Sequence, residues 1–224
     1  MFASARDGSD GVDLFVKNVN DDTPPAAIIH VPENLAPTDW PSEDVIVFER
    51  GAPSDLWTVD LSGDSAVARE YLTSEDAVSQ MSVSPSGDLA VYVSGETGRN
   101  EVYVRSFPEP GARERVSANG GRSPFWSPDG NTIYYWTLGP AEAVKTLLAS
   151  RVERGPPFVV TRTDSLLAGA YDPDNWDLHP DGDRFVITRQ ATDLVDAETD
   201  DNPAPERFLV VVNWFEELKA RMGN

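Results

Sequence analysis

Two histidines and a large excess of carboxylates are the side chains of this sequence that could support catalysis. A serine hydrolase needs a serine in a sharp Gly-X-Ser-X-Gly turn and a histidine that takes its proton. Residues 8–11, Gly-Ser-Asp-Gly, have the wrong spacing for that turn. His30 lies in an apolar run typical of a strand, and His179 occupies a turn position that serine holds in other parts of the chain. We therefore predict no catalytic residues and expect that the chain is not an enzyme.

The acidic segment 177–183 is the sequence's best candidate for a metal site. Its oxygen-bearing side chains alternate along the chain, as they do in part of a calcium loop. Such a loop ends on a bidentate glutamate at its twelfth position, where this chain has Thr188, and Pro180 interrupts the pattern. We therefore interpret segment 177–183 as an ordinary turn. We draw the same conclusion, that no metal is bound, for the other closely spaced aspartates, which are Asp10, Asp13, Asp172 and Asp174. We predict neither a metal nor a cofactor.

Charge and composition exclude several classes of partner. The chain has 18 basic and 38 acidic residues, a net charge of -20, which repels a phosphate backbone and argues against nucleic acid. It has no cysteine, so disulfides and thiolate metal sites are excluded. Its apolar runs are shorter than the roughly 20 residues of a membrane span. The first seven residues also lack the layout of a signal peptide, so the sequence itself assigns no compartment.

A repeated turn organises the chain. Four copies share an X-Pro step, small or acidic residues, and then an apolar stretch: Trp40-Pro41-Ser42-Glu43, Ser84-Pro85-Ser86-Gly87, Ser127-Pro128-Asp129-Gly130 and His179-Pro180-Asp181-Gly182. The prolines are 44, 43 and 52 residues apart. Proline presets φ, the acidic side chain accepts bonds from nearby amides, and glycine tolerates positive φ. A period of roughly 40 to 50 residues is typical of β-propeller blades.

Short apolar stretches follow each turn and predict the strands of each repeat. The first set is 45–48, 89–92, 133–136 and 185–187; the second is 12–16, 55–59, 101–104, 146–149 and 208–212; the third is 28–31, 66–68, 115–116 and 158–160. Such strands, bounded by Gly, Pro, Asn and Asp, are typical of antiparallel blades. We predict one all-β propeller domain, with about four complete four-stranded blades and a partial one, and a short helix over 213–221. The blade boundaries are expected at 1–35 (partial), 36–77, 78–121, 122–168 and 169–224.

The Ser-Pro-Asp-Gly turn and the strands after it resemble the TolB-like, WD-repeat-like propeller repeat over nearly the whole chain. Residues 208–218, ending in Val-Val-Asn-Trp-Phe-Glu-Glu-Leu, are similar to the C-termini of large bacterial serine/threonine kinases that carry such a propeller. This resemblance implies a sensor or interaction domain, often on the outer side of the cytoplasmic membrane. The repeats number fewer than the six usual for this type, so we expect closure by further blades of a longer protein or by oligomerisation.

A ligand of a propeller usually binds at the mouth of the central channel, which the starts of the inner strands line. The repeat positions place four residues there: Gln80, Arg122, Asn175 and Asp177. The six tryptophans, spread one or two per blade, are instead expected to pack between blades.

These observations favour a non-catalytic propeller that binds a protein or a small molecule. Its expected context is the C-terminal sensor region of a larger bacterial signalling protein, such as a serine/threonine kinase. One alternative is a TolB-like periplasmic scaffold of an envelope complex. The other is the propeller portion of a peptidase or hydrolase, which would require convergent acidic residues with a metal or a nucleophile in the channel.

Overall fold

A computed structural model describes residues 1–4, 11–20, 22–138, 144–182, 184–189 and 208–211. Within these ranges the chain is all-β, as predicted, and the structure contains no helix there. No membrane-spanning helix is therefore found in the described part of the chain. The helix predicted over 213–221 lies outside the described residues.

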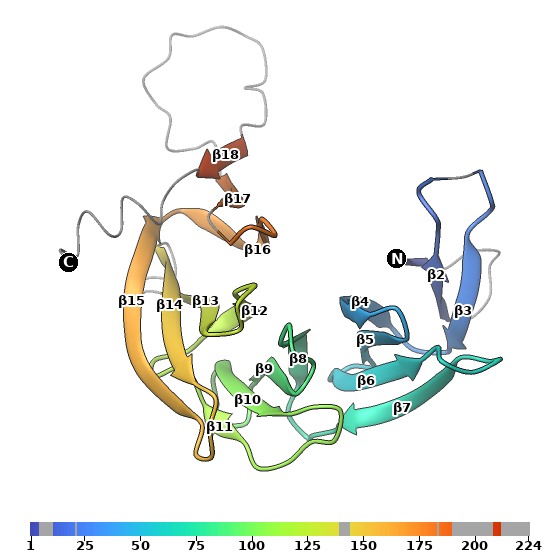
Figure 1. Cartoon of the computed structure of the whole chain (residues 1–224), viewed down its shortest axis with the longest axis horizontal. Coiled ribbons are helices and arrows are strands. Elements are labelled where there is room, and N and C mark those ends of the chain that lie inside the picture. Colours follow the sequence, from blue (N-terminus) through green and yellow to red (C-terminus); the bar gives the residue numbers. More distant parts are fainter. Residues whose placement is uncertain (5–10, 21, 139–143, 183, 190–207, 212–224) are drawn as a thin grey trace, which may run out of the picture. The chain divides into compact units, whose positions relative to one another are not determined.

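The strands form five antiparallel sheets, each built from consecutive strands in chain order (Figure 1). The first sheet contains β1 (Phe2–Ser4), β2 (Val12–Val16) and β3 (Ala26–Val31). The second contains β4 (Leu35–Ser42), β5 (Val45–Arg50), β6 (Asp55–Asp60) and β7 (Val67–Leu72). The third contains β8 (Val78–Val83), β9 (Leu89–Ser94), β10 (Glu101–Ser106) and β11 (Glu114–Arg115).

The last two sheets follow the same plan. The fourth contains β12 (Arg122–Trp126), β13 (Thr132–Leu138), β14 (Lys145–Glu153) and β15 (Val159–Gly169). The fifth contains β16 (Tyr171–Leu178), β17 (Phe185–Arg189) and β18 (Phe208–Val211). A four-stranded antiparallel meander repeated along the chain is the architecture of propeller blades.

The sheets group into two compact units, Met1–Ala118 with the first three sheets and Asn119–Asn224 with the last two. In the first unit, β5 explains how neighbouring sheets pack. Its consecutive residues Ile46, Val47 and Phe48 are all buried. Side chains alternate between the two faces of a strand, so both faces of β5 are covered. Ile46 and Phe48 join a cluster with the first sheet, and Val47 joins a cluster with the third. Because a neighbouring sheet packs against each face of the second sheet, consecutive residues of β5 are apolar.

In the second unit, one aromatic cluster joins the fourth and fifth sheets. Trp136 is fully buried, and its ring lies 6.0 Å from Tyr171 and 6.2 Å from Trp176. Phe185 and Ile187 of β17 complete this core from the other sheet. Aromatic side chains of this size bury large apolar areas, so these rings hold the two sheets together. The expectation that tryptophans pack between sheets is confirmed for Trp136 and Trp176.

The repeated turn has one hydrogen-bond pattern in three copies. The amides of Gly87, Gly130 and Gly182 donate to the carbonyls of Ser84, Ser127 and His179, at 2.8, 2.9 and 2.8 Å. All three glycines have φ between 69° and 76°, a backbone conformation that disfavours other side chains. In two copies the serine hydroxyl also accepts a bond from the amide that starts the next strand, Leu89 or Thr132. The turn predicted from the sequence therefore connects the first two strands of each of these three sheets.

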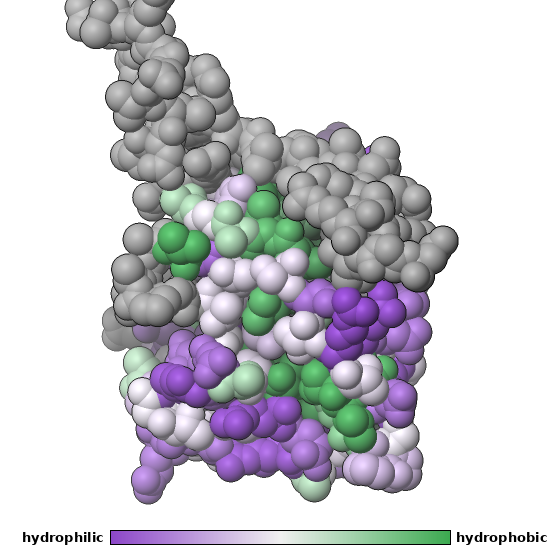
Figure 2. All heavy atoms as spheres, turned by 90° about the vertical axis from the view of Figure 1, so that its left-hand side faces the viewer, coloured by the Kyte–Doolittle hydropathy of each residue, from purple (hydrophilic) through white to green (hydrophobic). Residues whose placement is uncertain are grey.

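The hairpin of β14 and β15 is longer than the sequence predicted. We expected strands over 146–149 and 158–160, whereas the structure extends them to Lys145–Glu153 and Val159–Gly169. Residues 161–165 of this extension are polar and mostly exposed, and the apolar residues after them are adjacent, so no apolar alternation marked the strand. Thr161 and Thr163 are β-branched residues that favour strands without burial. On the side of the molecule where β15 lies, hydrophobic side chains are scattered among hydrophilic ones (Figure 2).

Candidate functional site

The first strand of each of the last four sheets is irregular near the predicted channel mouth. Bulges interrupt the pairing of β8 between Ser79 and Ser82 and of β12 between Arg122 and Phe125. Gln80 and Ser123, each five residues before its turn proline, adopt positive φ of 55° and 50°. Non-glycine residues rarely adopt this conformation, and bulges commonly redirect side chains next to functional sites. Each of the two bulges is therefore a candidate position for a functional site.

In the second unit, the bulge of β12 meets the start of β16 through an ion pair. The Nη2 atom of Arg122 donates to both carboxylate oxygens of Asp174, at 2.7 and 2.6 Å. The Ser123 hydroxyl donates to the same carboxylate at 3.1 Å. The Arg122 and Asp174 side chains are 30% and 48% exposed, so solvent and a ligand can reach both.

Asp172 and Asn175 extend this ion pair along β16. The Asp172 carboxylate accepts bonds from the Asn175 side-chain amide at 2.6 Å and from the Asp174 backbone amide at 3.1 Å. The Asn175 bond is the main cause of the lowered pKa of Asp172, with further lowering from the Asp174 amide and the charges of Lys145 and Arg122. We call Arg122, Ser123, Asp172, Asp174 and Asn175 the inner-strand network.

The inner-strand network presents hydrogen-bond donors and acceptors side by side. Arg122 and Asn175 supply N–H groups, and the carboxylates of Asp172 and Asp174 supply acceptors. Their mutual bonds hold these groups in fixed positions on two neighbouring strands, as the surface of a polar binding site requires. Among the residues the structure describes, no three His, Asp or Glu side chains gather in a way that could hold a metal ion.

In the first unit, the bulge of β8 is closed by carboxylates of the preceding sheet. The Gln80 amide donates to the Glu49 side chain, and the Val83 amide donates to the Asp39 side chain, both at 2.7 Å. Burial raises the pKa of both carboxyl groups, and these hydrogen bonds oppose the rise. A bulge leaves backbone amides without ladder partners, so these carboxylates satisfy donors that would otherwise be buried and unpaired.

Of the four predicted site residues, the structure brings two into one network. Arg122 and Asn175 both belong to the inner-strand network. Asp177 lies further along β16, opposite Val186 and exposed, beside a pocket of about 230 Å³ between β16 and β17. Gln80 lies in the first unit, where its backbone rather than its side chain makes the bond to Glu49.

Asp174 and Ser123 are members of the network that we had not assigned to the channel mouth. Asp174 is six residues before Pro180, as Arg122 is six residues before Pro128. This equivalence of position was the signal that could have identified the pair. Instead, the sequence presented Asp172 and Asp174 only as two close acidic residues.

Both histidines make structural hydrogen bonds. His179 takes the place of serine in the turn: its amide donates to the Arg184 carbonyl at 2.8 Å, and its Nδ1 accepts from the Asp181 amide at 3.2 Å. His30 lies on β3 opposite Asp13 of β2, and their side chains are 2.7 Å apart. These positions agree with the interpretation of both residues as parts of a turn and a strand.

Solved structures share this fold at low sequence identity. A chain of the nidogen/laminin complex matches 84% of this chain and 68% of its own length, with a TM-score of 0.61 and 10% identity. A prolyl endopeptidase matches 84% of this chain and 29% of its own length, with a TM-score of 0.52 and 16% identity. A structure assigned to TolB from Agrobacterium tumefaciens matches 77% and 76%, with a TM-score of 0.41 and 17% identity.

These similarities establish the fold. The chain has a β-propeller fold, as its sheets and the two superpositions with TM-scores above 0.5 agree. At identities of 10% and 16%, the activity or binding partner of one protein cannot be assigned to the other. No family model and no curated protein matches the sequence.

Proposed function

We propose that this chain is a non-catalytic binding propeller that recognises its ligand at the inner-strand network. The observation that carries the proposal is the half-exposed pair of Arg122 and Asp174, held by two bulged strands with Ser123 and Asn175 beside it. Bulges and a residue at positive φ are local irregularities that a sheet does not need for its own stability. Here they hold charged donors and acceptors where a polar ligand can reach them.

We also propose that the chain belongs to a larger bacterial signalling protein, such as a serine/threonine kinase, as its sensor or interaction region. The similarity of residues 208–218 to the C-termini of such kinases supports this context. A propeller suits this role because its loops and inner strands bind while the sheets stay rigid. Among the structural neighbours, the nidogen/laminin structure is a complex of two proteins, which fits a binding role for the fold.

Binding at the network is tested by a thermal-shift titration of the purified chain with short peptides, sugars and small dicarboxylates. At least one class should raise the melting temperature with concentration, because a ligand that binds only the folded state stabilises it. Arg122→Ala and Asn175→Ala should abolish that shift. Arg69→Ala, which removes an exposed arginine of the first unit, is the matched control and should leave it unchanged.

Two results would contradict the proposal. The first is a thermal shift that survives in both Arg122→Ala and Asn175→Ala, which would place the ligand elsewhere. The second is hydrolysis of peptide or ester substrates by the purified chain, which would favour a hydrolase. The kinase context is tested separately by reading the genomic sequence upstream of Met1 in frame. A kinase domain and a membrane span are expected there, whereas a periplasmic scaffold domain would overturn that part.

A further inference from the structure

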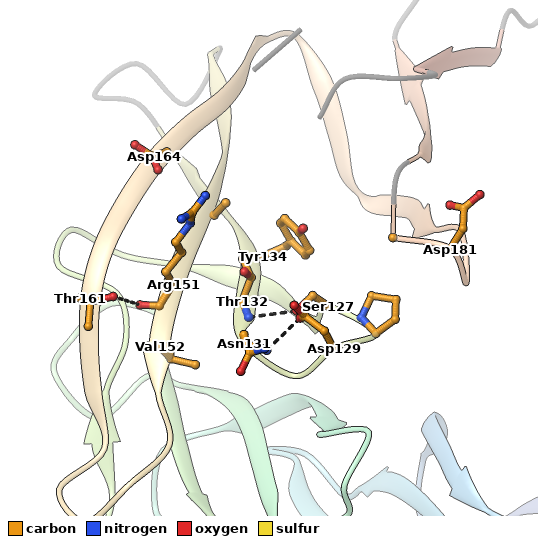
Figure 3. Close-up of a pocket in the computed structure, with 13 residues that line it drawn as sticks. Ser127, Asp129, Asn131, Thr132, Tyr134, Arg151, Val152, Thr161, Asp164 and Asp181 are labelled. Atoms are coloured by element: carbon orange, nitrogen blue, oxygen red, sulfur yellow. Dashed lines mark hydrogen bonds between the residues drawn. The ribbon is translucent and has the colours of Figure 1, made fainter. Parts of the chain in front are cut away.

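A cavity lined by polar and apolar residues lies within the unit Asn119–Asn224, on the turn side of the fourth and fifth sheets. It measures about 580 Å³, within the range of about 300 to 1,000 Å³ that holds small ligands. Strands β13, β14 and β15 form one wall, and the turn with Asp181 and Gly182 forms the other (Figure 3). That turn packs closely on Pro128: a Cβ atom at Gly182 would lie 3.2 Å from its ring.

The cavity wall contains one arginine. Arg151 of β14 extends into the cavity, and no ion pair of its guanidinium is found in the part of the chain that the structure describes (Figure 3). Arginine stays ionised in proteins, and its planar group matches a carboxylate. The Thr161 hydroxyl donates to the Arg151 carbonyl at 3.2 Å, which ties the neighbouring strand β15 to this residue.

Three carboxylates surround the same cavity, and each already has a partner. Asp164 pairs with Arg162 at 2.8 Å, and Asp181 pairs with Arg184 at 2.5 Å. Asp129 accepts bonds from the Ser127 hydroxyl at 2.5 Å and the Asn131 amide at 3.0 Å. Burial acts to raise the pKa of Asp129, but these hydrogen bonds outweigh it and lower the pKa, so this acid stays ionised.

The lining therefore offers a guanidinium for a carboxylate, and beside it carboxylates that keep a negative charge next to their present partners. Tyr134, Ala149 and Val152 also line the cavity, and each is largely buried. A purely anionic ligand would be repelled by the chain's net charge of -20, whereas a zwitterion is not. We propose that this cavity binds a free α-amino acid with an apolar side chain. Arg151 binds its carboxylate, Asp164 lies on the side of its ammonium group, and the apolar surfaces contact its side chain.

This inference concerns a site apart from the inner-strand network and does not depend on the ligand proposed there. The probe is L-leucine, titrated by isothermal calorimetry into the full chain. N-acetyl-L-leucine lacks the ammonium charge, and L-leucinamide lacks the carboxylate. Each should bind about tenfold or more weakly than L-leucine, because each lacks one of the two charged groups through which L-leucine contacts the cavity.

Variants separate the two halves of the site. Arg151→Gln should weaken L-leucine about tenfold or more, whereas Asp164→Asn should weaken L-leucine but leave N-acetyl-L-leucine unchanged. Arg69→Gln is the matched control and should bind L-leucine like the native chain. Urea unfolding of each variant checks that the fold is retained. We expect that it is for Arg151→Gln, because Arg151 is exposed and is not part of the core.

Three results would overturn the proposal. One is the absence of heat with L-leucine at millimolar concentration. The second is equal binding of L-leucine by the native chain and Arg151→Gln. The third is equal binding of L-leucine and N-acetyl-L-leucine by the native chain, which would remove the role of the carboxylates. Retained binding in Arg122→Ala, together with loss in Arg151→Gln, supports this cavity independently of the inner-strand network.

Discussion

The bulges of β8 and β12 occupy the same position in the repeat and differ in what surrounds them. In the first unit, Asp39 and Glu49 of the preceding sheet are desolvated, and they accept the Val83 and Gln80 amides of the bulge. In the second unit, the bulge carries the half-exposed pair of Arg122 and Asp174. A shared backbone irregularity thus serves packing in one place and presents charged side chains in the other. The position in the repeat determines the backbone conformation of the bulge, and the side chains around the bulge determine whether it serves packing or presents charges.

Removing the carboxylate that closes the first bulge tests this comparison most strongly. Asp39→Ala leaves the Val83 and Trp40 amides without their acceptor and should lower the free energy of unfolding by about 2 kcal/mol. Urea unfolding followed by tryptophan fluorescence measures the loss. Asp177→Ala, at an exposed carboxylate, is the control. If Asp174→Ala lowers the free energy of unfolding as much as Asp39→Ala does, the two bulges do not differ in the way described above.

The backbone of the bulges is tested by β-branched substitutions. Gln80→Val and Ser123→Val place a branched Cβ at φ of 55° and 50°, which should cost about 1 to 2 kcal/mol at each site. Glycine at either position removes that steric cost, so Gln80→Gly and Ser123→Gly should stay near the native stability. Equal stability of the valine and glycine variants would contradict the conformation described for these residues. Both pairs are compared by urea unfolding at one pH.

The pH dependence of stability should have opposite signs in the two regions. Because burial raises the pKa of Glu49, its contribution is fully present at low pH and is lost as pH rises through its folded-state pKa. The lowered pKa of Asp172 contributes stability that is present at neutral pH and is lost as pH falls through its folded-state pKa. Glu49→Gln should therefore gain stability relative to the native chain as pH rises from about 4 to about 7. Asp172→Asn should reduce the loss on acidification.

These signs are measured by urea unfolding of the native chain and the two variants over the same pH series. Glutamine keeps an acceptor for the Gln80 amide, so the comparison isolates the ionised charge of Glu49. If the difference in free energy of unfolding between the native chain and Glu49→Gln does not change with pH, the Glu49 carboxyl has the same pKa in the folded and unfolded states, and the prediction is wrong.

The smallest effect on stability is expected for the exposed ion pair. Arg122→Ala should change the free energy of unfolding by less than about 1 kcal/mol, because exposed pairs are screened by solvent. The same substitution should remove ligand binding at the network. A loss of several kcal/mol would show that the pair holds β12 to β16 instead of presenting charges to a ligand.

Much of the fold could be predicted because it is local. The Pro-Asp-Gly turns, the glycines at positive φ and the alternating strands depend on residues within a few positions of one another. The long hairpin of β14 and β15 could not be predicted in full, because residues 161–165 are polar and mostly exposed and carry no apolar alternation. For the candidate site, position in the repeat identified Arg122 and Asn175, but the partner Asp174 lies 52 residues from Arg122.

The amino-acid sequence by itself determined the all-β class, the repeat and the residues that form each turn, since these depend on backbone preferences and on the spacing of apolar side chains. Only the tertiary structure decided which carboxylates are buried and which are presented. Asp39 and Asp174 are both aspartates of first strands, and no local pattern separates them. Their difference arises from what the neighbouring sheet places against each, because desolvation and pairing depend on contacts between residues 44 and 52 positions apart.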